Sequence, residues 1–348
     1  MEKSNKNPSS VLYRKYRPHK WGDVIGQDHI VSVLEGSIKL NKIAHAYLFS
    51  GSRGTGKTST ARIFAQALEV SENDIYEIDA ASNRGIDDIR EIRDGVNVLP
   101  FESKYKVYII DEVHMLTKEA FNALLKTLEE PPSHALFILA TTETEKIPET
   151  VLSRCQVFTF RKPNREILKK HVSQIAKKEG YTLEAGSSDL ISLLGDGSFR
   201  DTLGILQKVV SSAKSKDISV TEIENITGAP KGNIVNDFIL AIALSEKQKA
   251  LSVIQIAKES NLSMKVFVSL ILEKLRIILL IKNAPDLVKV FKEQVSEDDW
   301  ELLEKISKDE KSKINSNILF QILKAYEGIG RAYIESLPLE IAVIELFS

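Results

Sequence analysis

The sequence predicts an α/β domain built on a parallel sheet, followed by a small helical domain and an all-helical domain. In the N-terminal part, short apolar runs with strand character alternate with segments of helical periodicity. After Pro163 the strand pattern disappears. Strands that alternate with helices form a parallel sheet covered on both faces. The predicted domains are residues 1–162, 163–228 and 229–348, with a hinge at Gly228-Ala229-Pro230.

The predicted strands are short and rich in apolar residues, as buried parallel strands are. They are Ala46–Ser50, Ile75–Ile78, Lys106–Ile110, Leu136–Ala140 and Val157–Phe160. Ligands of such sheets bind at the carboxyl ends of the strands. We therefore expect functional residues directly after these runs.

Helices are predicted where apolar residues recur every three or four positions. One helix is expected to run from the glycine-rich turn after Ser50 to about Leu68. Thr117 is a typical N-cap, and Pro131-Pro132 stops the helix that follows it. Beyond Pro163 the remainder, to Ser348, is predicted to be helical, with segments at Ile167–Ala176, Leu190–Leu194, Leu203–Val210, Thr221–Ile226, Val266–Ile281 and Ile318–Ile334.

Charge and cysteine content narrow the possible classes of protein. The net charge is -1, so any contact with DNA must come from a local basic patch. The single cysteine, Cys155, allows no intrachain disulfide and no cysteine-based zinc cluster. The first residues are polar and form no signal peptide, and charged residues interrupt the most apolar stretch, Leu270–Ile281. We therefore expect a cytoplasmic protein that does not contact membranes, with Leu270–Ile281 in a buried helix.

The strongest motif follows the first predicted strand and matches G-x-x-x-x-G-K-[ST]. Its residues are Gly51, Ser52, Arg53, Gly54, Thr55, Gly56, Lys57 and Thr58. Glycines let backbone N–H groups surround phosphate oxygens, and the start of the next helix adds its dipole. In this pattern the lysine neutralises the β- and γ-phosphates, and the threonine hydroxyl binds Mg²⁺. The alternative is a chance glycine turn, but the preceding strand and following helix favour a Mg-ATP site.

A pair of acids, Asp111 and Glu112, ends the third predicted strand. In sheets with a phosphate-binding loop, the first acid at this position holds Mg²⁺ and its water. The second acid can polarise the attacking water, because the metal occupies only the first. Alone, two acids at a strand end are commonly just solvated. Their place after a phosphate-binding loop favours the catalytic interpretation.

Three further residues could serve this site, and each has an ordinary alternative. Thr142, at the end of the fourth strand, can position water or sense the γ-phosphate, or it is simply a residue that favours strands. Arg154 can stabilise transition-state charge in a neighbouring subunit, or it is a surface arginine. Arg200 opens a predicted helix and can reach the nucleotide, or it is an exposed helix-start residue.

The other nucleophilic and metal-binding side chains form no motif. The histidines show no metal-ligand spacing, and His114 belongs to no H-E-x-x-H pattern. Cys155 has no histidine or acid close in sequence. We expect it to be a buried, inert thiol.

Several longer segments of the sequence are distinctive. They are Arg14–Pro18, Val24–Gln27, His45–Ser50, Glu77–Ser82, Asp111–Leu116, Asn122–Pro132, Ala140–Thr142 and Leu152–Cys155. Taken together, they make the chain resemble the gamma/tau subunit family of bacterial DNA polymerase III, the ATPase of the clamp loader. The resemblance is dense from about residue 11 to 210 and thins in the helical last third.

The resemblance implies a P-loop AAA+ domain, a helical lid and a helical collar that joins subunits. It also implies roles for single residues. Arg154 would act in trans as an arginine finger, Arg200 would contact ATP in cis as sensor 2, and Thr142 would be sensor 1. Val24 and Ile25 would pack against the adenine.

The implied reaction is ATP hydrolysis, with Mg²⁺, coupled to opening a sliding clamp and closing it on primer–template DNA. The implied partners are the delta and delta-prime subunits, further gamma copies, the clamp and DNA. Arg84 lies where members of the family meet the template backbone, although an ordinary solvated arginine is the alternative.

Two departures from the family pattern stand out. Members usually carry a four-cysteine zinc module after the P-loop helix, whereas here only Glu69–Asn73 links Leu68 to Asp74. The resemblance therefore implies no zinc for this chain. The sequence also stops after the presumed collar, which suggests a gamma-like extent rather than a tau-like one.

Two other functions remain open. One is a structural, non-hydrolysing subunit of the same assembly, similar to delta-prime, although that class typically has a degenerate phosphate loop. The other is a different AAA+ motor on DNA, such as a branch-migration helicase or a eukaryote-type clamp-loader small subunit. Nucleotide binding would separate the first from an ATPase, and strand displacement without a clamp would favour a helicase.

Overall fold

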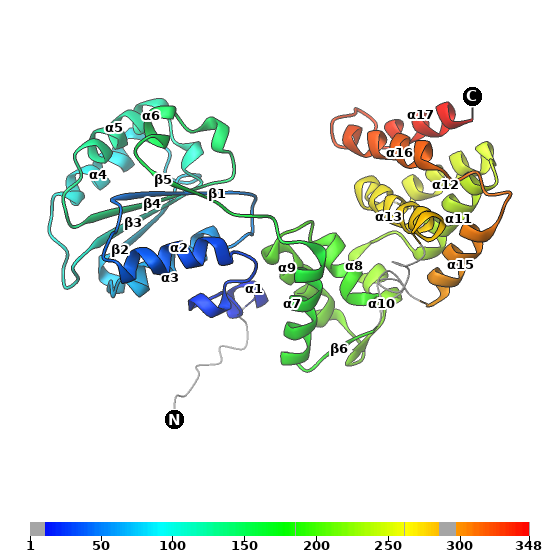
Figure 1. Ribbon diagram of the computed structural model, residues 1–348, viewed down its shortest axis with the longest axis horizontal. Coiled ribbons are helices and arrows are strands. Elements are labelled where there is room, and N and C mark those ends of the chain that lie inside the picture. The colour runs from blue at the N-terminus through cyan, green and yellow to red at the C-terminus, as the bar shows by residue number, and fades with distance from the viewer. Residues whose placement is uncertain (1–10, 185, 261, 285–296, 348) are drawn as a thin grey trace. The chain divides into compact units, whose positions relative to one another are not determined.

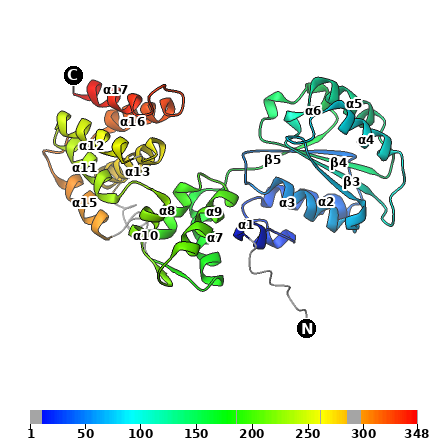
Figure 2. The same cartoon turned by 180° about the vertical axis from the view of Figure 1, so that it is seen from behind.

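The structure is a computed structural model, and it describes residues 11–184, 186–260, 262–284 and 297–347. The chain divides into two compact units (Figures 1 and 2). The first comprises the described residues of Met1–Leu168 together with Gly197–Leu203, and the second those of Lys169–Asp196 and Gly204–Ser348. The three-domain division expected from the sequence stays a prediction.

A five-stranded sheet forms the centre of the first unit. Its strand order is β2-β3-β4-β1-β5, and every neighbouring pair is parallel. This confirms the predicted parallel sheet. The strands are β1 Ala46–Ser50, β2 Ile75–Asp79, β3 Lys106–Asp111, β4 Ala135–Thr141 and β5 Gln156–Thr159.

Helices cover both faces of this sheet (Figures 1 and 2). Helices α2 and α3 pack on one face against side chains such as Tyr47 and Phe49, and α4 and α5 pack on the other against Leu48. Alternate residues of β1 thus serve opposite cores, as the period of a strand requires. The elements are α1 Leu12–Lys15, η1 Trp21–Asp23, α2 Asp28–Lys39, α3 Lys57–Ala67, η2 Glu72–Asp74, α4 Ile86–Val96, η3 Val113–Met115, α5 Lys118–Glu129, η4 Thr144–Lys146 and α6 Glu149–Leu152.

Beyond Pro163 the chain is mainly helical, as predicted, with two corrections. A short parallel pair joins β6 and β7 where no strand was expected, because two-residue strands carry too little periodicity to be recognised. The predicted run Ile318–Ile334 is also interrupted, since α16 ends at Gly328. The elements are α7 Arg165–Lys178, β6 Thr182–Leu183, α8 Ser187–Leu194, α9 Phe199–Ser212, β7 Asp217–Ile218, α10 Val220–Thr227, α11 Gly232–Ala243, α12 Lys247–Glu259, α13 Met264–Asn283, α15 Glu297–Lys308, α16 Ser316–Gly328 and α17 Leu337–Leu346.

A large apolar core in the second unit is built from α11, α12, α13, α15, α16 and α17. The apolar stretch Leu270–Ile281 lies in α13 and contributes buried residues to this core, as expected. Lys274 is buried there too, and its ammonium group lies 2.6 Å from a carboxylate oxygen of Asp299. Among the described residues, no helix is long and apolar enough to cross a membrane. The part of the predicted helical region at 285–296 lies outside the described residues.

Candidate nucleotide-binding site

The glycine-rich loop joins β1 to α3 and depends on glycine conformations. Gly51, Gly54 and Gly56 have φ values of +142°, +73° and +103°. Residues with a side chain adopt such values only with backbone strain. At Gly51 a Cβ would also lie 2.6 Å from the carbonyl oxygen of Phe160. Helix α3 begins at Lys57, directly after Gly56, so its positive end faces the loop. This is the geometry of an anion-binding loop.

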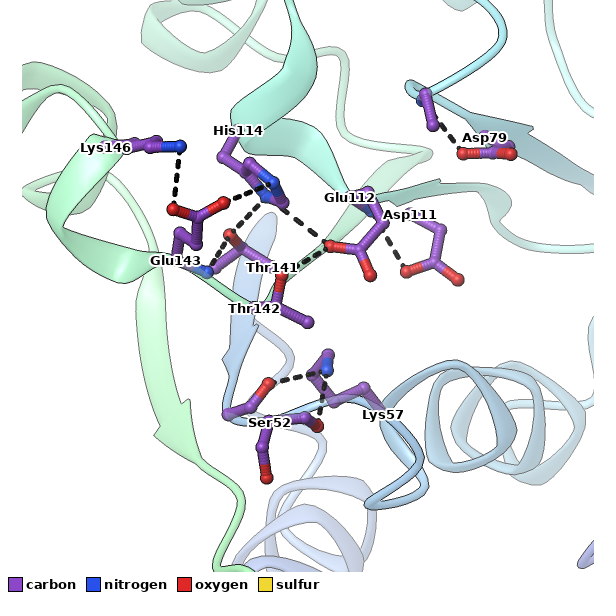
Figure 3. A network of polar contacts seen from close by, with 12 residues as sticks. Ser52, Lys57, Asp79, Asp111, Glu112, His114, Thr141, Thr142, Glu143 and Lys146 are labelled. Atoms are coloured by element: carbon purple, nitrogen blue, oxygen red, sulfur yellow. Dashed lines mark hydrogen bonds and ion pairs between the residues drawn. The ribbon is translucent and has the colours of Figure 1, made fainter. Parts of the chain in front are cut away.

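Lys57 is held by the loop itself. Its Nζ donates to the carbonyl oxygens of Gly51 and Ser52, at 2.7 and 3.0 Å, and the residue is only 6% exposed (Figure 3). Burial lowers the pKa of Lys57, and the carboxylates of Glu112 and Asp111 oppose this shift. A buried ammonium group that is bound only by neutral carbonyls suits a phosphate ligand, which supplies the missing negative charge.

Thr58 and Asp111 meet at the carboxyl ends of the strands. The hydroxyl of Thr58 donates to Asp111 Oδ2 at 2.7 Å. Hard oxygen ligands of this kind, a hydroxyl and a carboxylate, are those that Mg²⁺ takes in nucleotide sites. The two residues therefore fit the magnesium role expected from the sequence.

Glu112 adopts a left-handed backbone conformation, with φ 49° and ψ 43°, which is uncommon outside glycine. Its N–H donates to Asp111 Oδ1 at 3.0 Å, and its Oε2 accepts a hydrogen bond from Thr142 Oγ1 at 3.0 Å. The structure thus brings Thr142 to the second acid of the pair, because β4 lies beside β3.

His114 joins this group, although no sequence motif assigned it a role. Its ring is 5% exposed, with Nδ1 at 3.0 Å from Thr141 Oγ1 and 3.4 Å from Glu112 Oε2. Its Nε2 lies 3.2 Å from Glu143 Oε1, and Lys146 contacts the other oxygen of Glu143 at 2.7 Å. Figure 3 shows this chain of contacts. The only sequence signal was a polar residue in the short turn after a strand-end acid.

Arg200 reaches the loop within the first unit. The N–H of Phe199 donates to the carbonyl oxygen of Gly54 at 3.0 Å, and a Cβ on Gly54 would lie 3.3 Å from Arg200 Cβ. The guanidinium of Arg200 stacks over the ring of Tyr13, 5.0 Å from its centroid. Sequence reasoning missed Tyr13, since a lone aromatic residue in a short helix carries no signal of its own.

The contacts described for Arg154 lie away from the glycine-rich loop of its own chain. Its guanidinium donates to the carbonyl oxygen of Thr150 at 2.7 Å and to Glu129 Oε1 at 2.9 Å. The side chain is 34% exposed, so a partner molecule can approach it.

The remaining predicted residues lie apart from the polar network. Val24 and Ile25 follow η1 and are partly exposed. Arg84 is exposed, and its Nε donates to the carbonyl oxygen of Ala81 at 2.8 Å. It lies in the turn before α4, which begins only at Ile86. None of the contacts described for these three residues reaches the loop.

Within the described part of the chain, no cluster of three or more His, Cys, Asp or Glu side chains could hold a metal ion. The expected lack of zinc stays a prediction.

The sheet order, the glycine loop and the strand-end acids define a P-loop protein of the AAA+ class. A solved structure with this fold is the Thermotoga maritima RuvB Holliday junction branch migration motor. The structural match covers 65% of this chain and 79% of the RuvB chain, with a TM-score of 0.52 and 20% sequence identity. At that identity the likeness shows the fold alone.

Sequence comparisons identify the family. The chain matches the family described as DNA polymerase III, delta subunit over residues 26–84 and 69–164. It is 41% identical over 253 residues to DNA polymerase III subunit gamma of Buchnera aphidicola, and the match covers 67% of each of the two chains. It is 47% identical over 241 residues to subunit tau of Bacillus subtilis, covering 63% of this chain and 42% of the relative.

The subunit gamma/tau of Mycobacterium tuberculosis is 35% identical over 79% of this chain and 52% of its own length. The chain thus spans about half the length of the tau and gamma/tau relatives named here. It belongs to the gamma/tau subunit family of DNA polymerase III, as the sequence motifs indicated.

Proposed function

We propose that this chain is an ATP-hydrolysing motor subunit of a DNA polymerase III clamp loader, coupling ATP binding and hydrolysis to loading of the sliding clamp on primed DNA. The observation that carries the proposal is the convergence of the loop lysine, the Thr58–Asp111 contact and the Glu112–Thr142 contact at one sheet edge. A subunit that only binds its neighbours needs no such arrangement.

Each residue has a chemical task. The loop from Gly51 to Gly56 would surround the phosphates with N–H groups, and Lys57 would exchange its carbonyl partners for phosphate oxygens. Thr58 and Asp111 would hold Mg²⁺, which neutralises charge on the phosphates. Glu112 would orient and polarise the attacking water.

Arg200 would contact the nucleotide in cis, and its closeness to Gly54 supports this. Thr142 would sense the γ-phosphate from its place beside Glu112. Packing of Val24 and Ile25 on the adenine, and a phosphate contact of Arg84 with template DNA, rest on the family resemblance alone.

Arg154 would complete the site of an adjacent subunit. Two observations favour an assembly of this kind. Arg154 is partly exposed, and its described contacts lie away from its own loop. In the second unit, large apolar side chains remain exposed at helical spacing on two neighbouring helices, as an interface between subunits would require. They are Phe320 and Leu323 on α16, and Leu337, Ile341 and Ile344 on α17.

The partners proposed are further copies of this chain, delta and delta-prime subunits, the sliding clamp and primer–template DNA. The proposed location is the cytoplasm. These proposals follow from the names and roles of the gamma/tau family, and the share of each relative that the chain covers limits them to proposals.

The decisive experiment measures ATP hydrolysis by the assembled complex, with and without the sliding clamp and primed DNA. We expect low basal hydrolysis that clamp and DNA together stimulate. Lys57→Ala should lower the stimulated rate about a hundredfold or more, because an interaction used in the transition state is lost. Lys126→Ala, which removes an exposed lysine of α5, is the matched control and should leave the rate unchanged.

One alternative has an observation behind it. The match to the delta-subunit family favours a structural subunit, and ATP binding without any hydrolysis in the complex would support it. The other alternative left open by the sequence is a helicase, and strand displacement without the clamp would support it. Either outcome would replace the proposal.

A further inference from the structure

We propose that His114 is a positioning residue for Glu112: its imidazole, fixed by Glu143 and Lys146, holds one carboxylate oxygen of Glu112 so that the other faces the attacking water. This inference deepens the proposed function and rests on it. It assigns a task to a residue to which the sequence motifs gave no role.

Glu112 is held by one of its two carboxylate oxygens. All contacts described for its side chain end on Oε2, which accepts from Thr142 at 3.0 Å and lies 3.4 Å from His114 Nδ1. The other oxygen, Oε1, therefore remains available to accept a proton from water. When one carboxylate oxygen is held, the carboxylate keeps its orientation while the other oxygen can still accept a proton from water.

Both ring nitrogens of His114 face carboxylate oxygens. Nε2 lies 3.2 Å from Glu143 Oε1, and Nδ1 lies 3.4 Å from Glu112 Oε2. Because a carboxylate only accepts, each nitrogen needs its own hydrogen to bind its carboxylate. Lys146 contacts the second oxygen of Glu143 at 2.7 Å. The ring is 5% exposed, so burial and this contact together restrict its rotation.

The Nδ1 side of the ring also contacts Thr141. The Thr141 hydroxyl oxygen lies 3.0 Å from Nδ1 and accepts the backbone N–H of Glu143 at 3.0 Å. Glu112, which follows β3, and Thr141, at the end of β4, therefore both contact the ring of His114 (Figure 3). This is the relation of a base to a third group that orients it, which recurs in enzymes with activated nucleophiles.

The simpler interpretation is that His114 only stabilises the turn Val113–Met115. The two interpretations differ in what a substitution changes. A structural residue affects the folded fraction and the binding of ATP together with turnover. A positioning residue for the base affects kcat while KM and ATP affinity stay the same.

The test compares two substitutions of similar size in the assembled complex. In His114→Asn the amide stands where Nδ1 was and can still reach Glu112, whereas in His114→Gln it stands near Nε2 and reaches only Glu143. We expect His114→Gln to lower kcat about ten- to a hundredfold, the range typical of groups that orient a reacting residue. His114→Asn should remain within about threefold of wild type, and both should bind ATP normally.

Glu143→Gln provides a second variant, since Glu143 is 38% exposed and its substitution leaves the core intact. It should lower kcat by less than His114→Gln, because a neutral amide still contacts the ring. His134→Ala is the control: His134 contacts the carbonyl oxygen of Val96, away from the site, and kcat should not change.

The inference is overturned if Asn and Gln at position 114 have equal kcat values, or if kcat falls only in proportion to ATP affinity or folded fraction. If both variants fail to fold, Glu143→Gln with wild-type kcat overturns it. These outcomes differ from failure of the proposed function, in which the wild-type complex itself does not hydrolyse ATP.

Discussion

Thr58 Oγ1 donates a 2.7 Å hydrogen bond to Asp111 Oδ2, although the two residues are 53 positions apart in the chain. Thr58 lies in the first turn of α3, which follows β1, and Asp111 is the last residue of β3. Both strands pair with β4, so their carboxyl ends meet at one edge of the sheet. The contact brings the two proposed magnesium ligands together.

Loss of either ligand should remove the dependence of ATP affinity on Mg²⁺. We expect Thr58→Ala and Asp111→Asn to bind ATP equally with and without Mg²⁺, and to hydrolyse it about a hundredfold more slowly. Titration of a fluorescent ATP analogue at varied Mg²⁺ measures the first effect. Asp94→Asn, which changes an exposed acid of α4, should keep the wild-type dependence. Retained Mg²⁺ dependence in both ligand variants would show that the ion is held elsewhere.

Arg154 should act across a subunit boundary. Complexes in which every copy carries Arg154→Ala should bind ATP normally but hydrolyse it about a thousandfold more slowly, the effect of removing an arginine finger. Mixing Arg154→Ala copies with Lys57→Ala copies should restore part of the rate, because one chain supplies the arginine and the other the loop. No recovery on mixing would contradict a role in trans.

The same substitution should barely affect stability. The pair Arg154–Glu129 lies at the surface, with 34% and 50% of the two side chains exposed. Exposed pairs contribute about 0–1 kcal/mol to the free energy of unfolding. Thermal melting of Arg154→Ala should therefore match wild type, which separates the kinetic effect from a folding defect.

Gly54 should tolerate no side chain. Its φ is +73°, and a Cβ would lie 2.0 Å from Ser198 Oγ and 3.0 Å from Ser198 Cβ. Gly54→Ala should destabilise the protein by about 1–3 kcal/mol and weaken ATP binding, because the loop must move. Gly36→Ala is the control, since a Cβ there meets nothing within 4 Å inside α2, and it should be neutral or stabilise by about 0.4–1 kcal/mol. Denaturant unfolding of both variants provides the comparison.

Asp74 should make stability depend on pH at the acid end. Burial alone would raise the pKa of Asp74, but hydrogen bonds from the backbone N–H groups of Glu102, Phe101 and Ser103 outweigh it and lower the pKa to about 2. A carboxyl whose pKa falls on folding stabilises the folded state above its unfolded pKa of about 4, and this stabilisation is lost as pH falls through about 2.

Asp74→Asn should therefore lower the free energy of unfolding by about 2 kcal/mol at neutral pH, and the difference from wild type should shrink below pH ~4. Urea unfolding at a series of pH values measures it. A deficit that stays constant down to pH ~2 would show that the charge of Asp74 is not the cause.

Cys155 should be unreactive in the folded protein. Burial raises the pKa of Cys155 to about 12, so at pH 8 roughly one thiol in ten thousand is ionised. Alkylation of the native protein at that pH should be slow and become fast in denaturant. Rapid labelling of the native protein would contradict the expectation of an inert thiol.

The amino-acid sequence alone determined the strands of the five-stranded sheet, the glycine loop and the two acids at the end of β3. These are local features: a strand shows as an apolar run, and the loop needs glycine where φ is positive. The sequence also indicated that Arg200 opens a helix, which begins at Phe199.

The tertiary structure decided which of these residues meet. Thr142 reaches Glu112 because β4 pairs with β3, and strand order is a property of the whole chain rather than of any local period. The same holds for His114 between two strand ends, and for Arg200 beside Gly54. Local patterns place residues on elements, whereas contacts between residues far apart in the chain follow only from the packing of those elements.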